Sequence, residues 1–281
     1  MKTILVPIDY SAESMTGLKT ALDIACQVNG EITMLHNMEV ATDPESKNPD
    51  EFKVVDHKSE IDNEEQLVER LERLRGLRIQ YHVPRMKMNF MVSQKLNHDE
   101  LSRLIQKYQV DLIVIGKKQK HQSPTFLLEK LEVVDNRGKQ HTTPVLGVKD
   151  YPSKLKYNKM FVNVDYGSSD IEFLKLVNQL ADLLGMQVYI NSYNTSSIKK
   201  DSGDSEKIQV YIDQKLKQQN FNMISEIGES CDANLLTEKV KGLEVDLAVT
   251  TNANNSLLGK MEDLQIPQLE RAFNELIPEF K

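Results

Sequence analysis

The chain has 281 residues, enough for one large domain or two smaller ones. Hydrophobic residues make up 40% of it and charged residues 27%, a balance that excludes disordered, collagen-like and coiled-coil chains. The formal net charge is −7, and neither half of the chain has the basic surplus that neutralises phosphates. We therefore expect no nucleic acid among its partners.

Cysteine content and apolar runs indicate the compartment. Cys26 and Cys231 are too few for a disulfide framework or a thiolate metal site. The apolar runs, such as residues 4–8, are far too short to cross a membrane, and no signal peptide is recognisable. The sequence therefore predicts a soluble protein of the reducing cytoplasm that has no membrane partner.

The first elements are expected directly at the N-terminus. Residues 4–8 form a nearly continuous apolar run, which is typical of a strand buried on both faces of a parallel sheet. Ser11 can cap an amphipathic helix that follows, and Gly30 suits the left-handed position that ends such a helix. Residues 31–36 then predict the next strand.

The alternation of strand and helix continues to about residue 150. An apolar stripe from Ile61 to Leu74 predicts a helix. Residues 77–83 alternate between apolar and polar side chains and predict a strand that resumes over residues 86–92. This order implies right-handed crossovers and a mainly parallel sheet. The remaining expected elements are a helix from residue 98, a buried strand at 110–116, a helix at 126–131 and a last strand at 143–148.

The same order restarts near residue 158, which indicates an internal duplication. The matching segments are residues 160–166 with 4–10, residues 185–190 with 30–35, and residues 245–249 with 110–114. The sequence thus predicts an α/β chain of two tandem domains, residues 1–150 and 156–281.

The second copy is expected to be shorter at its C-terminal end. Residues 194–205 are polar and predict a linker. Residues 267–273 have a helical pattern where the first copy has Pro144, Val145 and Leu146. The second sheet therefore either lacks its last strand or replaces it with a helix.

Several motifs of the first copy occur in a fixed order. They are an apolar strand ending in Asp9-Tyr10-Ser11, a helix closed by Gly30, a strand ending in Leu35-His36, the run 110–116, and Pro144-Val145-Leu146. Together they resemble the universal stress protein family, and parts of the second copy do so as well. The resemblance implies two Rossmann-like domains, of the adenine nucleotide alpha hydrolase-like type, packed about a pseudo-twofold axis as in the family's homodimers.

One branch of this family binds ATP through a loop in which Gly, two residues, Gly and nine residues precede Gly-Ser or Gly-Thr. Glycines let the backbone approach phosphate oxygens, and N–H groups at a helix N-terminus meet their charge. Here Gly116 matches the first position, but Gln119, Glu129 and Lys130 stand at the other three, and the second copy matches no better. We therefore expect the glycine phosphate loop to be lost.

The residues that the resemblance assigns to the nucleoside are retained. Asp9 and its second-copy equivalent Asp165 match the family's aspartate after the first strand, and Asn37 falls where a backbone contact to adenine is expected. The alternative is that each aspartate only ends its strand and caps the following turn.

Lysines follow the strand that ends at Gly116. Lys117, Lys118 and Lys120 lie at a strand's carboxyl end, which is where open α/β sheets bind ligands. These lysines either hold an anion by side-chain charge, in place of backbone N–H groups, or belong to a solvated loop.

No catalytic or metal-binding residues are expected, because the six histidines lack metal-ligand spacing and no nucleophile elbow or Walker loop is present. The leading hypothesis is a cytoplasmic tandem universal stress protein that acts as a non-catalytic binding or regulatory module on unidentified protein partners. The alternative is an adenine-nucleotide switch or slow ATPase, with ATP held by Asp9 and the lysines at 117–120. The two copies are expected to pair within a monomer, or the chain to form a homodimer.

Overall fold

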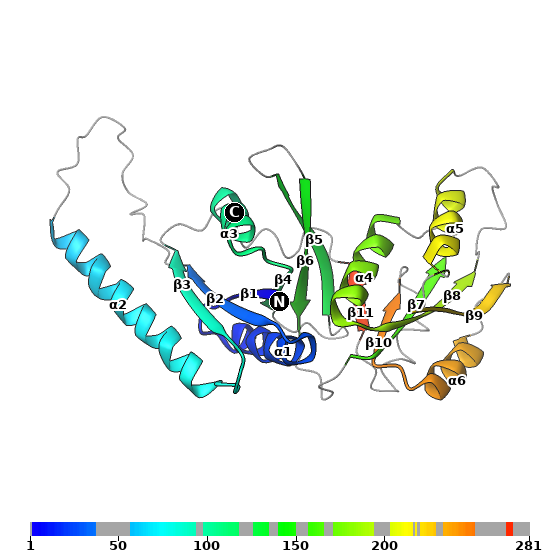
Figure 1. Ribbon diagram of the computed structural model, residues 1–281, viewed down its shortest axis with the longest axis horizontal. Coiled ribbons are helices and arrows are strands. Elements are labelled where there is room, and N and C mark those ends of the chain that lie inside the picture. Colours follow the sequence, from blue (N-terminus) through cyan, green and yellow to red (C-terminus); the bar gives the residue numbers. More distant parts are fainter. Residues whose placement is uncertain are drawn as a thin grey trace.

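The described residues form one continuous sheet. Its 11 strands lie in the order β3-β2-β1-β4-β6-β5-β11-β10-β7-β8-β9, with helices packed against them (Figure 1). The α/β class and the mainly parallel sheet are confirmed. The computed structural model describes residues 2–37, 57–93, 98–117, 126–134, 140–149, 157–165, 171–193, 203–215, 217, 220–228, 233–250 and 268–271.

We call the part of the chain from β1 to β6 the first repeat. Its strands are parallel to one another, apart from β5, which is antiparallel to β6. Its elements are β1 (Thr3–Pro7), α1 (Ala12–Val28), β2 (Glu31–Asn37), α2 (His57–Gln80), β3 (Met88–Ser93), α3 (His98–Tyr108), β4 (Leu112–Gly116), β5 (Phe126–Val134) and β6 (Gln140–Val148).

The second repeat has the same strand order. The order β9-β8-β7-β10-β11 matches β3-β2-β1-β4-β6 of the first repeat. Thr3 pairs with Glu31 and Lys159 pairs with Gln187, so equivalent residues of the two repeats differ by 156 in number over these elements. Its elements are β7 (Lys159–Asp165), α4 (Ile171–Leu184), β8 (Gln187–Tyr193), α5 (Gly203–Lys215), β9 (Phe221–Gly228), α6 (Ala233–Leu243), β10 (Leu247–Thr250) and β11 (Gln268–Arg271).

Each repeat has an equivalent aspartate that accepts hydrogen bonds from the backbone at the start of its first strand. Asp111 Oδ2 accepts the Thr3 N–H at 2.8 Å. Asp246 Oδ2 accepts the N–H groups of Asn158 and Lys159 at 2.9 and 3.0 Å. This contact explains why the Val-Asp-Leu motif recurs in the sequence, because its aspartate accepts hydrogen bonds from backbone N–H groups that have no partner in the sheet.

β5 connects the two repeats into one sheet. It lies between β6, to which it is antiparallel, and β11, to which it is parallel. The sheet consequently reverses direction once, at the β5–β6 pair. The carboxyl ends of the strands therefore lie at one edge in the first repeat and at the opposite edge in the second, as a pseudo-twofold relation requires.

The apolar core covers both faces of the sheet. Ile4 and Val6 of β1 pack on the side of α1, in a cluster that continues into the second repeat through residues such as Met160. Leu5 points to the other face and packs with Leu101 of α3. A strand that is covered on both faces must be apolar at nearly every position, which is the pattern that marked β1 in the sequence.

Most of the expected elements are present. The strands expected at residues 4–8, 31–36, 86–92, 110–116 and 143–148 are β1, β2, β3, β4 and β6. Ser11 caps α1 as expected, because its hydroxyl accepts the N–H of Ser14 at 3.1 Å.

The strand expected over residues 77–83 is wrong, since α2 continues to Gln80. Leu74 is fully buried, and Leu77, three residues further, packs against the same core, so the helical spacing continues. Ile79, whose apolar side chain produced the alternation, is 68% exposed.

The helix expected over residues 126–131 is also wrong, since this segment lies in β5. Phe126 and Leu128 are buried in the cluster on the α1 side, and Leu131 is buried in the cluster on the α3 side. A short apolar run fits a strand buried on both faces as well as a helix, and here its neighbours in the sheet decide.

The C-terminal segment 267–273 contains a strand where a helix was expected. β11 pairs in parallel with both β10 and β5, and Leu269 lies between Val249 and Phe126 with no exposed surface. Two neighbouring strands thus override the local helical pattern. The second repeat keeps its last strand, which is only four residues long.

The end of α1 differs from the expectation by one residue. Asn29, with φ 51°, occupies the left-handed position expected for Gly30. Gly30 is needed for another reason, because a Cβ there would lie 2.8 Å from the Lys2 carbonyl oxygen. In the second repeat the equivalent of Asn29 is Gly185, with φ 67°, so the expected match of residues 185–190 with 30–35 is shifted by one residue.

Some expectations fall outside the described residues. The boundary between the domains, residues 150–156, is one of them and stays a prediction. Of the linker expected at 194–205, residues 194–202 also lie outside, whereas α5 already begins at Gly203. None of the helices in the described part of the chain is both long and apolar enough to cross a membrane.

Candidate functional site

Four of the expected site residues lie along one edge of the sheet. Asn37 ends β2, Asp9 follows β1, Gly116 ends β4, and Lys117 follows it. Because β1 lies between β2 and β4, and all three are parallel, their carboxyl ends are adjacent. The structure therefore brings these four residues to the edge where open α/β sheets bind ligands.

Of the other two expected residues, Asp165 is not part of this group. Asp165 ends β7, where its backbone pairs with Tyr193, and this carboxyl end lies at the opposite edge of the sheet. The side chain of Asp165 and the whole of Lys118 lie outside the described residues.

Asp9 is fixed by the residues that begin α1. Its Oδ1 accepts the Ser11 N–H at 2.9 Å and the Ser11 hydroxyl at 2.5 Å. Partial burial opposes ionisation of Asp9, but the hydrogen bonds from Ser11, with a contribution from Ser14, outweigh burial and lower the pKa of the carboxyl group. Asp9 thus does what a capping residue does, and it carries a negative charge at neutral pH.

The lowered pKa of Asp9 predicts acid-sensitive stability. The ordinary pKa is 3.8 and the folded value lies below it, so ionised Asp9 stabilises the folded state above about pH 3.8, and this contribution disappears as the pH falls through the folded pKa. Asp9→Asn keeps an acceptor oxygen without the charge. We expect the difference in unfolding free energy between the two proteins to be constant near neutral pH and to shrink below about pH 4. Urea denaturation from about pH 6 to about pH 3 measures it, and a difference independent of pH would contradict the prediction.

Gly116 is required by the packing of α1 on β4. A Cβ at Gly116 would overlap the carbonyl group of Glu13, in the first turn of α1, and would lie 2.8 Å from the Ser14 nitrogen. A Cβ at Gly17 would in turn lie 2.7 Å from the Gly116 nitrogen. The glycine at the first position of the phosphate-loop pattern therefore has a structural role that involves no ligand.

Lys117 is the part of the lysine cluster that the structure describes. It is half-buried, and its N–H donates to the Val148 carbonyl at 2.8 Å, which continues the β4–β6 pairing by one residue. The backbone at this position is therefore held by the sheet.

The end of the phosphate-loop pattern lies inside β5. Glu129 is 7% exposed and lies opposite Val145, and Lys130 lies opposite Pro144. The Lys130 ammonium is 2.6 Å from Glu132 and 3.8 Å from Glu172 of α4. The hydrogen bond from Lys175 lowers the pKa of Glu172, and the positive charges of Lys175 and Lys130 lower it further. Partial burial acts in the opposite direction but is outweighed.

The sequence did not single out the aromatic side chain beside Asp9. Tyr10 has φ 66°, a left-handed conformation that residues other than glycine seldom adopt. Its hydroxyl donates to the Arg70 carbonyl at 3.1 Å, its ring lies 5.0 Å from the ring of His36, and the Arg73 guanidinium lies 5.7 Å from its centroid. Tyr10 thus links the carboxyl ends of β1 and β2 to α2. In the sequence, only its position next to Asp9 could have indicated that it belongs to this edge.

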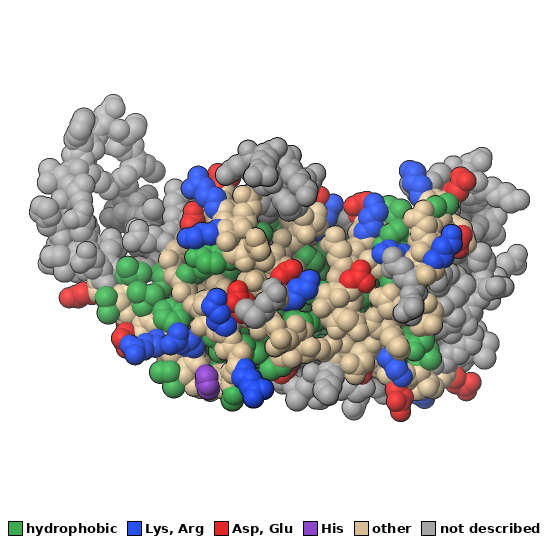
Figure 2. All heavy atoms as spheres, in the orientation of Figure 1, with side chains coloured by type: hydrophobic (Ala, Val, Ile, Leu, Met, Phe, Trp, Pro, Cys, Tyr) green, Lys and Arg blue, Asp and Glu red, His purple; other side chains and the backbone are tan. Residues whose placement is uncertain are grey.

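Charged side chains do not gather by sign on the face of the molecule in Figure 2. There, the described lysine and arginine side chains are interspersed with aspartate and glutamate. Among the described residues, no three histidine, cysteine, aspartate or glutamate side chains lie close enough together to hold a metal ion.

The sequence comparison places the first repeat in a family. Residues 1–131 match the model of the universal stress protein family. Among curated proteins, no sequence matches the chain.

Similar solved structures include two universal stress proteins of comparable length. One, from Archaeoglobus fulgidus DSM 4304, is 13% identical with a TM-score of 0.47, covering 96% of this chain and 98% of that one. Another, a putative universal stress protein from Pseudomonas aeruginosa UCBPP-PA14, is 15% identical with a TM-score of 0.38, and the match covers 100% of this chain and 96% of that one. A universal stress protein in complex with cAMP is 18% identical with a TM-score of 0.23, and the match covers 41% of this chain and 75% of that one. At these scores the structures carry no weight for function.

Proposed function

We propose that this chain, whose residues 1–131 belong to the universal stress protein family, serves as a cytoplasmic binding or regulatory module that catalyses no reaction of its own. Membership of the family supports a role in the stress response. The finer proposal is that the first repeat has lost the glycine loop that would hold ATP phosphates, and that the protein acts on other proteins.

The observation that carries this proposal is the position of Glu129 and Lys130. A phosphate loop offers free backbone N–H groups at a helix N-terminus. Here the two residues lie within a strand, opposite β6, and one of them is a buried glutamate. A carboxylate in that position repels phosphate, and the Lys130 ammonium is directed to Glu132 and Glu172.

The retained motif residues have structural reasons that support the same proposal. Asp9 Oδ1 accepts a hydrogen bond from Ser11, and the absence of a side chain at Gly116 makes room for the Glu13 carbonyl. Neither residue needs a nucleotide to explain its presence.

The test is a calorimetric titration of ATP, ADP and AMP into the full-length protein, after a denatured aliquot has been checked for retained nucleotide. We expect no retained nucleotide and no binding in the micromolar range. Micromolar binding that is weakened by Asp9→Asn, with Asp165→Asn as the matched change in the second repeat, would overturn the proposal.

A second candidate function is an adenine-nucleotide switch or slow ATPase. It is favoured by the position of Asn37, Asp9 and Lys117 along one carboxyl edge. Nucleotide would then be held by the Asp9 carboxylate and by lysine side chains. Release of phosphate from ATP, abolished by Lys117→Ala, would support this function over the first.

The repeats are proposed to act as a pseudo-dimer within one chain. β5 is hydrogen-bonded to strands of both repeats, so their last strands are covered within the chain. We expect a monomer in light scattering, and a homodimer would contradict this part of the proposal.

A further inference from the structure

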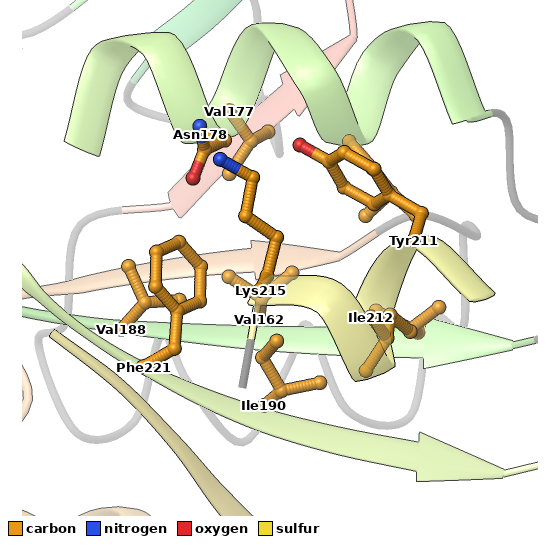
Figure 3. Close-up of a pocket in the computed structure, with 11 residues that line it drawn as sticks. Val162, Val177, Asn178, Val188, Ile190, Tyr211, Ile212, Lys215 and Phe221 are labelled. Carbon is orange, nitrogen blue, oxygen red and sulfur yellow. The ribbon is translucent and has the colours of Figure 1, made fainter. Parts of the chain in front are cut away.

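A hollow beneath α4 and α5 in the second repeat offers little room for a ligand. It is lined by apolar side chains of β7, β8 and β9, such as Val162, Ile190 and Phe221 (Figure 3). It has space for about one water molecule, and the rest of its volume is open to solvent. A larger partner does not fit in it, whereas the outer face of α2 in the first repeat is accessible.

α2 lies at one end of the molecule, beside the edge strand β3 (Figure 1). Leu74 is fully buried and Leu77 packs against the same core, so the inner side of α2 is held to the sheet. The other labelled elements lie on this inner side (Figure 1). In the second repeat α5 follows β8 as α2 follows β2, with 13 residues against the 24 of α2. Covering the sheet therefore does not need a helix as long as α2.

Four side chains follow one another along the outer face of α2, and we call them the α2 stripe: Val68, Glu72, Arg75 and Ile79. Their spacings of four, three and four residues place them on one side of the helix. All four are exposed, and the apolar Val68 and Ile79 are 58% and 68% exposed. Glu72 and Arg75 form no ion pair with any residue that the structure describes. An acid and a base without partners thus lie between two exposed apolar side chains.

The α2 stripe is complementary to itself when its direction is reversed. Val68 lies four residues before Glu72, and Ile79 lies four residues after Arg75. Two identical antiparallel helices can be related by a twofold axis midway between Glu72 and Arg75. Glu72 of each copy then faces Arg75 of the other, and Val68 faces Ile79. The pair would make two ion pairs and two apolar contacts with the same stripe on both sides.

We infer that α2 pairs antiparallel with α2 of a second copy of this chain, through the α2 stripe. The contact is short, at the low end of protein interfaces, so we expect a dissociation constant on the order of 100 µM. Light scattering at micromolar concentration would still find a monomer. α2 lies at the β3 end of the sheet and β5 lies at its centre, so the pairing leaves the pseudo-dimer within each chain unchanged (Figure 1).

The experiment is sedimentation equilibrium of the full-length protein at concentrations from about 5 µM to about 500 µM. We expect the wild type to change from monomer to dimer over this range. Glu72→Arg and Arg75→Glu are each expected to weaken association at least about tenfold, because the twofold axis turns two opposite-charge contacts into two like-charge contacts. The double variant reverses both ion pairs and keeps them complementary, so it should associate like the wild type.

An equimolar mixture of the two single variants is the decisive sample, because each copy carries the charges that the other lacks. The mixture should associate about as strongly as the wild type, although each variant alone does so at least about tenfold more weakly. An effect confined to the stability of one helix would not produce this recovery. Glu206→Arg makes the same charge change at an exposed residue of α5 and should leave association unchanged.

The inference is wrong if the wild type stays monomeric up to about 500 µM, or if both single variants associate as it does. It is also wrong if neither the double variant nor the mixture regains association, since the two stripes would then not face each other. A dimer that is complete at about 5 µM and insensitive to both charge reversals would overturn this inference and the proposed pseudo-dimer together. A weak dimer that both reversals disrupt supports the inference and leaves the pseudo-dimer intact.

Discussion

Gly116→Ala is expected to destabilise the protein by more than about 3 kcal/mol, enough to prevent folding of a marginally stable chain. The added methyl group would overlap the Glu13 carbonyl and press on the Ser14 nitrogen. Both are backbone atoms in the first turn of α1, so no side chain can turn away to make room. α1 would have to move off β4, although its face toward the sheet includes buried core residues such as Leu18.

Gly76→Ala is the matched control for this change. Gly76 lies within α2, and apart from its chain neighbours and the backbone of its own helix no atom lies within 4 Å of the position that its Cβ would take. Alanine there should stabilise the protein by about 0.5–1 kcal/mol, since it favours the helix and meets no obstacle. Urea denaturation of both variants measures the contrast. Wild-type stability of Gly116→Ala would contradict the packing argument and would return this glycine to a role in ligand binding.

The parts of the fold that could be predicted are those in which local pattern and tertiary environment agree. β1 and β4 are apolar throughout because both of their faces are covered, and the run of residues alone shows it. The placement of Asp9, Asn37 and Gly116 at one edge was expected from the family resemblance, together with the parallel sheet that the alternation of strands and helices predicts.

The segments that were predicted wrongly depend on partners distant in the sequence. Residues 126–131 and 267–273 become strands because β5 and β11 pair with each other and with β6 and β10. No local pattern contains that information, and short apolar runs fit both kinds of element. The same pairing determines the environment of Glu129. From the sequence, Glu129 could only be identified as a residue that does not match the phosphate-loop pattern.

Gln27→Ala is expected to cost about 2–4 kcal/mol, because one side chain joins the two repeats through three hydrogen bonds. Gln27 Nε2 donates to the carbonyls of Tyr157 at 2.6 Å and Leu184 at 2.8 Å, and Oε1 accepts the Tyr157 N–H at 2.9 Å. These are backbone groups of the second repeat reached from α1 of the first. Alanine would remove all three hydrogen bonds from a partly buried contact, and Tyr157 is itself 3% exposed.

Two further variants separate this contact from general effects on α1. Cys26→Ala changes the exposed neighbouring residue and should stay within about 0.5 kcal/mol of the wild type. Gln27→Glu keeps an acceptor for the Tyr157 N–H but sets a carboxylate against two carbonyl oxygens, so it should be at least as destabilising as alanine. Urea denaturation measures all three proteins. If Gln27→Ala is as stable as Cys26→Ala, the repeats are held together by the pairing of β5 with β6 and β11 alone. A large loss would show that α1 and the sheet fix their arrangement jointly.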